Sequence, residues 1–192
     1  MPGTERRNSS DAIFTERASG LTRRAFISGS ALALGALALL PRALRAADAR
    51  FALGAPALDA LAKGHLVYVS PLRADGRESR CHGEVWYFWD RDAVVIATAT
   101  TGWKVRALKG GKDKARIWVG DYGPYSGAAE KLRAAPTFLA SAAVDAERAT
   151  FDRLLASYGA RYPDEWGKWK PRFESSYKDG SRTVVRYTPI GA

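Results

Sequence analysis

The chain has 192 residues, of which 46% are hydrophobic and 26% are charged, a size and composition typical of one globular domain with a buried core. Its formal net charge is +10, which favours anionic ligands and acidic surfaces as partners. We expect no nucleic-acid partner, because the basic residues are scattered and no nucleic-acid-binding motif is present. Cys81 is the single cysteine, which excludes an internal disulfide.

The amino-terminal part differs from the rest in composition. A polar stretch is followed by Arg23 and Arg24, then by an apolar run that Pro41 closes, and the tripeptide at 47–49 has alanine at both ends. Small residues at these two positions are what signal peptidase requires. The run is too short for a membrane span, which needs about 20 apolar residues. The pattern predicts a removable signal over residues 1–49, and an uncleaved amino-terminal anchor is the alternative.

The arginine pair, the aromatic Phe26 and the apolar run resemble a twin-arginine export signal. The resemblance implies folding in the cytoplasm, passage through the twin-arginine export machinery, and a periplasmic or otherwise exported location. Because that route often carries proteins that acquire a cofactor before export, a bound cofactor is expected in the mature domain, residues 50–192.

The mature part begins with a short amphipathic helix over 51–63, which Gly64 ends. Tight turns at 73–76 and 90–92 then divide a meander of strands. From Gly102 the period changes to that of a short helix, which Thr100 or Thr101 is expected to cap. Enrichment in β-branched residues and alternation predict six strands. They cover residues 65–72, 79–89, 94–100, 114–121, 136–144 and 182–188.

The later helices follow from capping and spacing. After a loop rich in turn formers at 122–127 and the fifth strand, Asp145 is expected to cap a helix whose apolar residues recur from Phe151 to Tyr158. Another short helical stretch starts at Pro163. An Asp-Gly turn at 179–180 leads into the closing strand. The pattern predicts a mainly β (α+β) fold of antiparallel strands with a few short helices.

The second predicted strand is apolar on both faces near residues 85–89, whereas an antiparallel strand with one wet face should alternate. Two interpretations are open. The segment is a barrel wall with the core inside and a subunit or planar ligand outside, or its aromatic residues fill a large core and lie under the later helices.

The start of the helix at Gly102 is a candidate anion site. Backbone N–H groups of Gly102, Trp103 and Lys104 lie at the positive helix end, and the Lys104 and Arg106 cations lie beside them. Such an arrangement can bind a phosphate. An ordinary solvated helix start is the alternative.

Two stretches resemble the pyridoxamine 5'-phosphate oxidase-like split-barrel family of flavin-binding proteins. HGEVWY at 82–87 is similar to the family's second strand, which lies beside the cofactor. TATTGWK at 98–104, with Leu108 following, is similar to its strand-end threonine, serine-arginine-lysine triplet and helix leucine. The resemblance covers most of the mature chain and implies a six-stranded antiparallel split β-barrel that binds FMN at the interface of a homodimer.

The resemblance also implies site residues. It places Lys104 on the FMN phosphate, while Gly102 and Trp103 stand where the family has serine and arginine, so backbone N–H groups would replace two contacts. Further charge is expected from Arg80, His82, Arg106 and Arg116. The flavin ring or ribityl chain is expected to contact Thr98, Thr100 and Trp86.

The resulting hypothesis is an exported FMN-dependent oxidoreductase with a small-molecule substrate or electron carrier and unassigned catalytic residues. Pyridoxamine phosphate is not the expected substrate, because family members that oxidise it carry an arginine and histidine pair near the carboxyl end and this tail has no histidine. One alternative is a non-catalytic module for flavin, deazaflavin or haem, with His65 or His82 as axial haem ligand. Another is an empty barrel that acts as a scaffold. No metal site is predicted, since Cys81 and the two histidines form no convincing ligand set.

Overall fold

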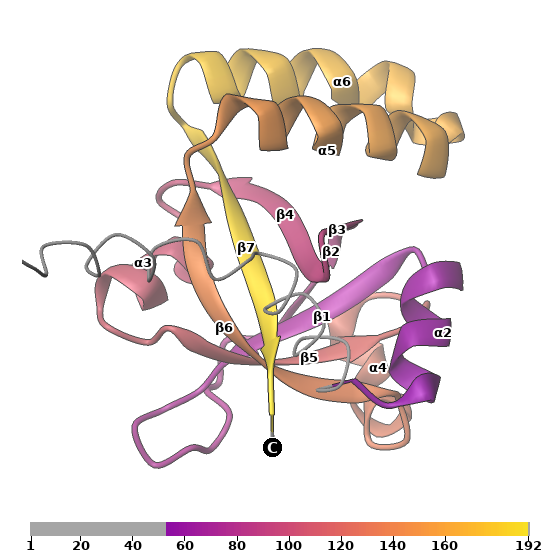
Figure 1. Cartoon of the computed structure of the whole chain (residues 1–192), viewed down its shortest axis with the longest axis vertical. Helices are drawn as coiled ribbons and strands as arrows, with labels where there is room; N and C mark the ends of the chain where they lie inside the picture. Colours follow the sequence, from indigo (N-terminus) through magenta and orange to yellow (C-terminus); the bar gives the residue numbers. More distant parts are fainter. Residues whose placement is uncertain (1–52, 192) are drawn as a thin grey trace, which may run out of the picture. The chain divides into compact units, whose positions relative to one another are not determined.

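The computed structural model describes residues 53–191; the predicted export signal and the first residues of the predicted 51–63 helix lie outside this range. The described chain forms five helices and seven strands (Figure 1). In chain order they are α2 (Ala55–Lys63), β1 (Leu66–Pro71), β2 (Gly83–Trp86), β3 (Phe88–Asp90), β4 (Ala93–Ala99), α3 (Trp103–Lys109), β5 (Lys114–Val119), α4 (Tyr125–Leu132), β6 (Thr137–Asp145), α5 (Arg148–Arg161), α6 (Pro163–Lys178) and β7 (Arg182–Ile190).

The strands form one antiparallel sheet in the order β2-β1-β5-β6-β7-β4-β3, which curves into a nearly closed barrel. The predicted split β-barrel is therefore confirmed. Its interior is filled by side chains that alternate inward along the strands, among them Val67, Val94, Ile96, Ile117 and Val185, all fully buried.

The barrel has seven strands where six were predicted, because the predicted strand 79–89 is interrupted at Tyr87. The Tyr87 N–H donates to the Tyr162 hydroxyl (3.1 Å) instead of to a neighbouring strand. The Tyr87 hydroxyl lies 2.8 Å from the Leu61 carbonyl and 2.9 Å from that of Gly64. Before this break the segment pairs with β1, and after it with β4. Since β2 and β3 stand at opposite ends of the strand order, one segment brings the two ends of the sheet together.

Helices cover two parts of the barrel's outer face. Phe151, Leu154 and Tyr158 of α5 pack on Val95 and Ala97 of β4, and α6 adds its own aromatic residues to this cluster. On another part, α4 packs on Tyr68 and Trp118. Val85 of β2 packs against the interior cluster, whereas Trp86 packs against the α5–α6 cluster. Both apolar faces of this segment are thus covered within the chain, as the second interpretation holds.

Three helix predictions need correction. The predicted loop 122–127 runs into helix α4, which starts at Tyr125. Asp145 does not cap α5, because it ends β6 and its carboxylate accepts the Glu147 N–H (3.0 Å). Helix α6 starts at Pro163 as predicted but runs for 16 residues. It continues past Pro171 because Trp166, Trp169 and Phe173 pack against neighbouring aromatic rings, and packing of one face supplies most helix stability. No helix of the described range is long and apolar enough to cross a membrane.

Candidate functional site

The candidate site lies where β2 approaches β4 without forming a ladder with it. This gap is the split of the barrel. Gly83 and Val85 lie along β2, and Ala97 and Thr98 lie near the end of β4. Helix α3 begins shortly after β4 ends, and α5 and α6 cover the neighbouring outer face. Residues far apart in the sequence therefore meet at this gap.

Lys104 is the cation at one end of the site. Its ammonium lies 4.2 Å from the centroid of the Trp103 ring. A Cβ on Gly83 would come 3.7 Å from the same nitrogen, so β2 passes close to it. Burial lowers the pKa of Lys104 to about 8, and the Glu84 carboxylate opposes this shift. Within residues 53–191 the ammonium makes no ion pair and no hydrogen bond, and the Glu84 carboxylate accepts the Tyr125 N–H (3.1 Å).

The two departures from the family triplet have a structural reason. A Cβ at Gly102 would lie 2.9 Å from the Ala99 carbonyl oxygen, so a serine would not fit here without a shift of the backbone. The Trp103 ring packs against Gly83, whose Cβ would be 3.4 Å from it, and supports Lys104 through the cation–π contact. Trp103 therefore positions the lysine instead of adding a second cation.

The two predicted threonines have different surroundings. Thr98 is paired with Thr183 of β7, and its hydroxyl lies close to Gly102. Thr100 is tied to the turn before β7, because its hydroxyl donates to the Gly180 carbonyl (3.1 Å). Neither Thr100 nor Thr101 caps α3, whose N-cap is Gly102 without a side-chain hydrogen bond. The predicted threonine cap is wrong because the N-cap position falls on Gly102 and the Thr100 hydroxyl bonds to the turn at Gly180.

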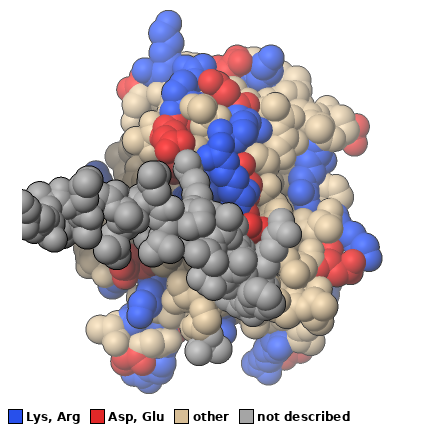
Figure 2. Space-filling model, in the orientation of Figure 1, with Lys and Arg blue, Asp and Glu red and all other residues tan. Residues whose placement is uncertain are grey.

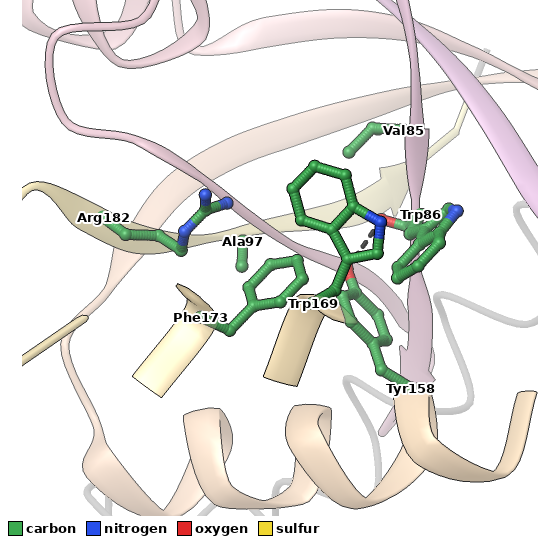
Figure 3. A pocket seen from close by; sticks show the side chains of 7 residues that line it. All are labelled: Val85, Trp86, Ala97, Tyr158, Trp169, Phe173 and Arg182. Carbon is green, nitrogen blue, oxygen red and sulfur yellow. Dashed lines mark hydrogen bonds between the residues drawn. The ribbon is translucent and has the colours of Figure 1, made fainter. Parts of the chain in front are cut away.

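A cavity of about 250 Å³, hereafter the aromatic pocket, lies on the α5–α6 side of the split (Figure 3). It is lined by Val85, Trp86, Ala97, Tyr158, Trp169, Phe173 and Arg182. The Trp86 ring is held by stacking on Tyr162 at a centroid distance of 4.2 Å. The Tyr158 hydroxyl donates to the Trp86 carbonyl (2.7 Å). The walls are therefore fixed rings, which suit a planar ligand.

Sequence reasoning found Trp86 but not the other polar and aromatic walls of this pocket. Trp169 and Phe173 have a helical spacing that indicates only a buried face of α6, and Arg182 begins the last strand. No local pattern relates α6 and β7 to β2. These residues come together only because α6 packs beside Trp86, at centroid distances of 6.2 Å for Trp169 and 6.4 Å for Phe173.

The other predicted cations have surroundings of their own. His82 stacks on Tyr125 of α4 at 4.6 Å and lines a separate cavity of about 300 Å³ on that side. Arg80 is exposed in the β1–β2 connection. Arg106 donates to the Thr101 carbonyl, and Arg116 pairs with Glu78 (2.8 Å).

Charge on the surface is mixed, as the sequence suggested. Figure 2 shows lysine and arginine interspersed with aspartate and glutamate on the face drawn. Within the described residues no group of three or more histidine, cysteine, aspartate or glutamate side chains could hold a metal ion. The distinctive chemistry of the site is thus a cation without an anionic partner beside an aromatic pocket.

Solved structures similar to this chain are split-barrel proteins of the pyridoxamine 5'-phosphate oxidase-like kind. The heme storage protein HutZ from Vibrio cholerae matches with a TM-score of 0.50 and 13% identity, over 70% of this chain and 88% of HutZ. A putative pyridoxamine 5'-phosphate oxidase from Listeria innocua has a TM-score of 0.43 and 11% identity, over 69% and 89% of the two chains. One from Lactobacillus delbrueckii has a TM-score of 0.43 and 17% identity, over 72% and 90%.

The likeness to HutZ shows the fold. No protein-family model and no curated protein matches the sequence.

Proposed function

We propose that this protein is an FMN-binding flavoprotein that acts as an exported oxidoreductase. The observation that carries the proposal is the Lys104 ammonium, which is partly buried, has a pKa lowered by that burial, and makes no hydrogen bond or ion pair with an anion among the described residues. A desolvated cation costs free energy until an anion pairs with it. The sequence resemblance assigns a phosphate to this same lysine.

The residues of the site fit FMN in two parts. Lys104 would hold the phosphate, and the aromatic pocket would hold the ring. The two lie near each other along β2. A Cβ on Gly83 would come 3.7 Å from the Lys104 nitrogen, and Val85, two residues further on, lines the pocket. At about 250 Å³ the pocket is slightly smaller than usual small-molecule sites, which span about 300–1,000 Å³. It therefore suits a ring system better than a whole nucleotide.

When bound, FMN would supply hydride or electron transfer. The chain's own contribution is binding and orientation. Lys104 neutralises a phosphate, Trp103 holds that lysine in place, and the pocket walls around Trp86 exclude water from the ring. Pyridoxamine phosphate is not proposed as substrate, because neither the pocket nor the carboxyl-terminal tail contains a histidine.

Haem is the second candidate, since HutZ is a heme storage protein with the same fold. The aromatic pocket argues for flavin instead, because none of its lining residues is a histidine, cysteine or methionine. The Tyr158 hydroxyl is engaged by Trp86. His82 stacks on Tyr125, and His65 pairs with Asp121 at 3.0 Å. The pocket thus offers haem no available axial ligand.

Export and homodimer formation complete the proposal. Export is supported by the arginine pair and the apolar run, which lie outside the described residues. The homodimer is supported by the sequence resemblance alone, since α5 and α6 already cover the outer apolar face near Trp86.

The deciding experiment is an absorption spectrum of the protein expressed with its own leader in a host that supplies flavin and haem. We expect two flavin bands, in the near-ultraviolet and the blue. A Soret band would replace the proposal with haem binding. For protein that purifies colourless, FMN is added and tryptophan fluorescence is followed. No visible band together with no response to FMN would overturn the proposal and favour an empty scaffold.

A further inference from the structure

Arg182, at the start of β7, is a second cation at the site and lines the aromatic pocket, where it is paired in register with Ala99 of β4. Its guanidinium carbon lies 4.4 Å from the centroid of the Phe173 ring, and its Nε donates to the Ser176 hydroxyl (2.8 Å). Within the described residues no carboxylate pairs with it. Burial lowers the pKa of Arg182, an effect that the nearby Tyr158 opposes. The guanidinium is therefore desolvated without being neutralised.

The other half-buried arginines of the described chain are engaged. Arg153 and Arg186 both donate to the Asp90 carboxylate, at 2.8 and 2.7 Å. Arg116 pairs with Glu78. Arg161 donates to the carbonyls of Leu61 and Gly64. Arg182 differs from them because it has neither a carboxylate nor a carbonyl partner among the described residues and donates only to the Ser176 hydroxyl. It is also the one of these arginines that lines the aromatic pocket.

Figure 3 shows Arg182 and Trp86 at opposite ends of the pocket, with Phe173 and Trp169 between them. Phe173 contacts both, since its ring is 6.4 Å from that of Trp86 and 4.4 Å from the Arg182 guanidinium. A planar ligand lying along these rings would present one edge to the arginine. The Nη groups of Arg182 donate to no described residue, so they are free to bind an acceptor at that edge. Guanidinium groups bind carboxylates and similar anions through paired hydrogen bonds.

We propose that Arg182 makes the aromatic pocket selective for planar rings that carry negative charge at one edge. The extension to the cofactor rests on the proposed function. The reduced flavin ring carries a negative charge, whereas the oxidised ring is neutral. The pocket is therefore expected to bind the reduced ring more tightly than the oxidised ring.

The test uses two probes of equal size, 2-naphthoate and the neutral 2-naphthamide. Each is titrated into the full-length protein while tryptophan fluorescence is followed. Wild type should bind naphthoate at least about tenfold more tightly, as one hydrogen bond between charged groups provides. Arg182→Gln, which can still donate to Ser176, should bring the ratio close to one. Arg182→Lys should restore part of it.

Arg172→Met is the matched control, because Arg172 also contacts an aromatic wall, 5.2 Å from the Trp169 ring, but does not line the pocket. It should keep the wild-type ratio. Circular dichroism of each variant checks folding, and if Arg182→Gln does not fold, Arg182→Lys against wild type gives the comparison. Equal affinity of wild type for the two probes, no binding of either, or an undiminished ratio in Arg182→Gln would overturn the proposal.

These outcomes are separable from those of the proposed function. If the protein prefers naphthoate but does not bind FMN, the charge-selective pocket is supported and the FMN proposal is rejected. If the protein binds FMN but does not prefer naphthoate, the FMN proposal is supported and the proposed role of Arg182 is rejected.

Discussion

Two groups of buried charges differ in how they are neutralised. In the first, which we call the Asp90 network, Asp90 accepts hydrogen bonds from Arg153 and Arg186, and Arg186 also pairs with Asp145 (3.0 Å). In the second, Lys104 and Arg182 lie at the split, and neither has a carboxylate partner among the described residues.

The Asp90 network joins β3, α5, β6 and β7. Burial alone would raise the pKa of Asp90, but the hydrogen bonds from Arg153 and Arg186 outweigh it and hold that pKa below its usual value. All the charges in this network have partners inside the chain, so its role is to hold the elements together. The cations at the split have N–H donors that bind no described residue, and a site for an anionic ligand requires such donors. The contrast separates charges that stabilise the fold from charges that bind.

The largest expected effect is on stability. Asp90→Ala leaves Arg153 and Arg186 without their shared carboxylate, so the free energy of unfolding should fall by about 3–5 kcal/mol. Urea unfolding followed by fluorescence measures it. Asp59→Ala is the control, because Asp59 pairs with Lys63 at the surface and such pairs contribute about 0–1 kcal/mol. Equal losses in both variants would contradict a special role for the network.

Lys104→Met tests the other half of the comparison. FMN affinity should fall by about 1.5–3 kcal/mol, the contribution of a hydrogen bond to a charged group. Stability should not fall, because the variant removes a desolvated cation that has no partner. Isothermal titration and urea unfolding measure the two effects. Lys109→Met is the matched control, since Lys109 is exposed on the same helix. Unchanged FMN affinity in Lys104→Met would move the phosphate elsewhere.

The pH dependence of FMN affinity is a second test of the assignment of Lys104 to the FMN phosphate. In the free protein the pKa of Lys104 is lowered to about 8, whereas a phosphate monoester is already a dianion there, with a second pKa of about 6. As pH rises through 8 the ammonium loses its proton, so affinity should fall, approaching tenfold per pH unit. Titrations between pH 7 and pH 9 measure it. Riboflavin, which lacks the phosphate, should not show the fall, and a parallel fall for both ligands would contradict the role of Lys104.

The smallest change in FMN affinity is expected for His82→Ala. The sequence resemblance implies a cofactor contact for His82, but its ring stacks on Tyr125 and makes a tilted contact with Trp118 on the α4 side. FMN affinity should therefore change less than about twofold, within the range of a distant substitution. A loss comparable to that of Lys104→Met would show that the site extends to the α4 side.

Most of the fold was predictable, because strands rich in β-branched residues can be recognised from their local sequence alone. The 94–100 segment became β4, and the turn at 179–180 correctly preceded β7. The break at Tyr87 was not predictable, because it depends on Tyr162, a residue 75 positions away. Helix α4 was not predicted, because its N-cap is Pro124 and Gly127 stands in its first turn, and both residue types indicate a loop by local chemistry.

The residues of the candidate site likewise divide into those that local sequence predicts and those that the fold brings together. Periodicity and a short motif are local properties, so the amino-acid pattern was enough to predict where the strands run and that Lys104 follows a strand end. Packing between distant segments brings Trp86 to Trp169, Phe173 and Arg182 and places His82 beside a separate cavity. Alternation along a strand sorts side chains into two faces, but which element covers each face depends on packing between distant segments.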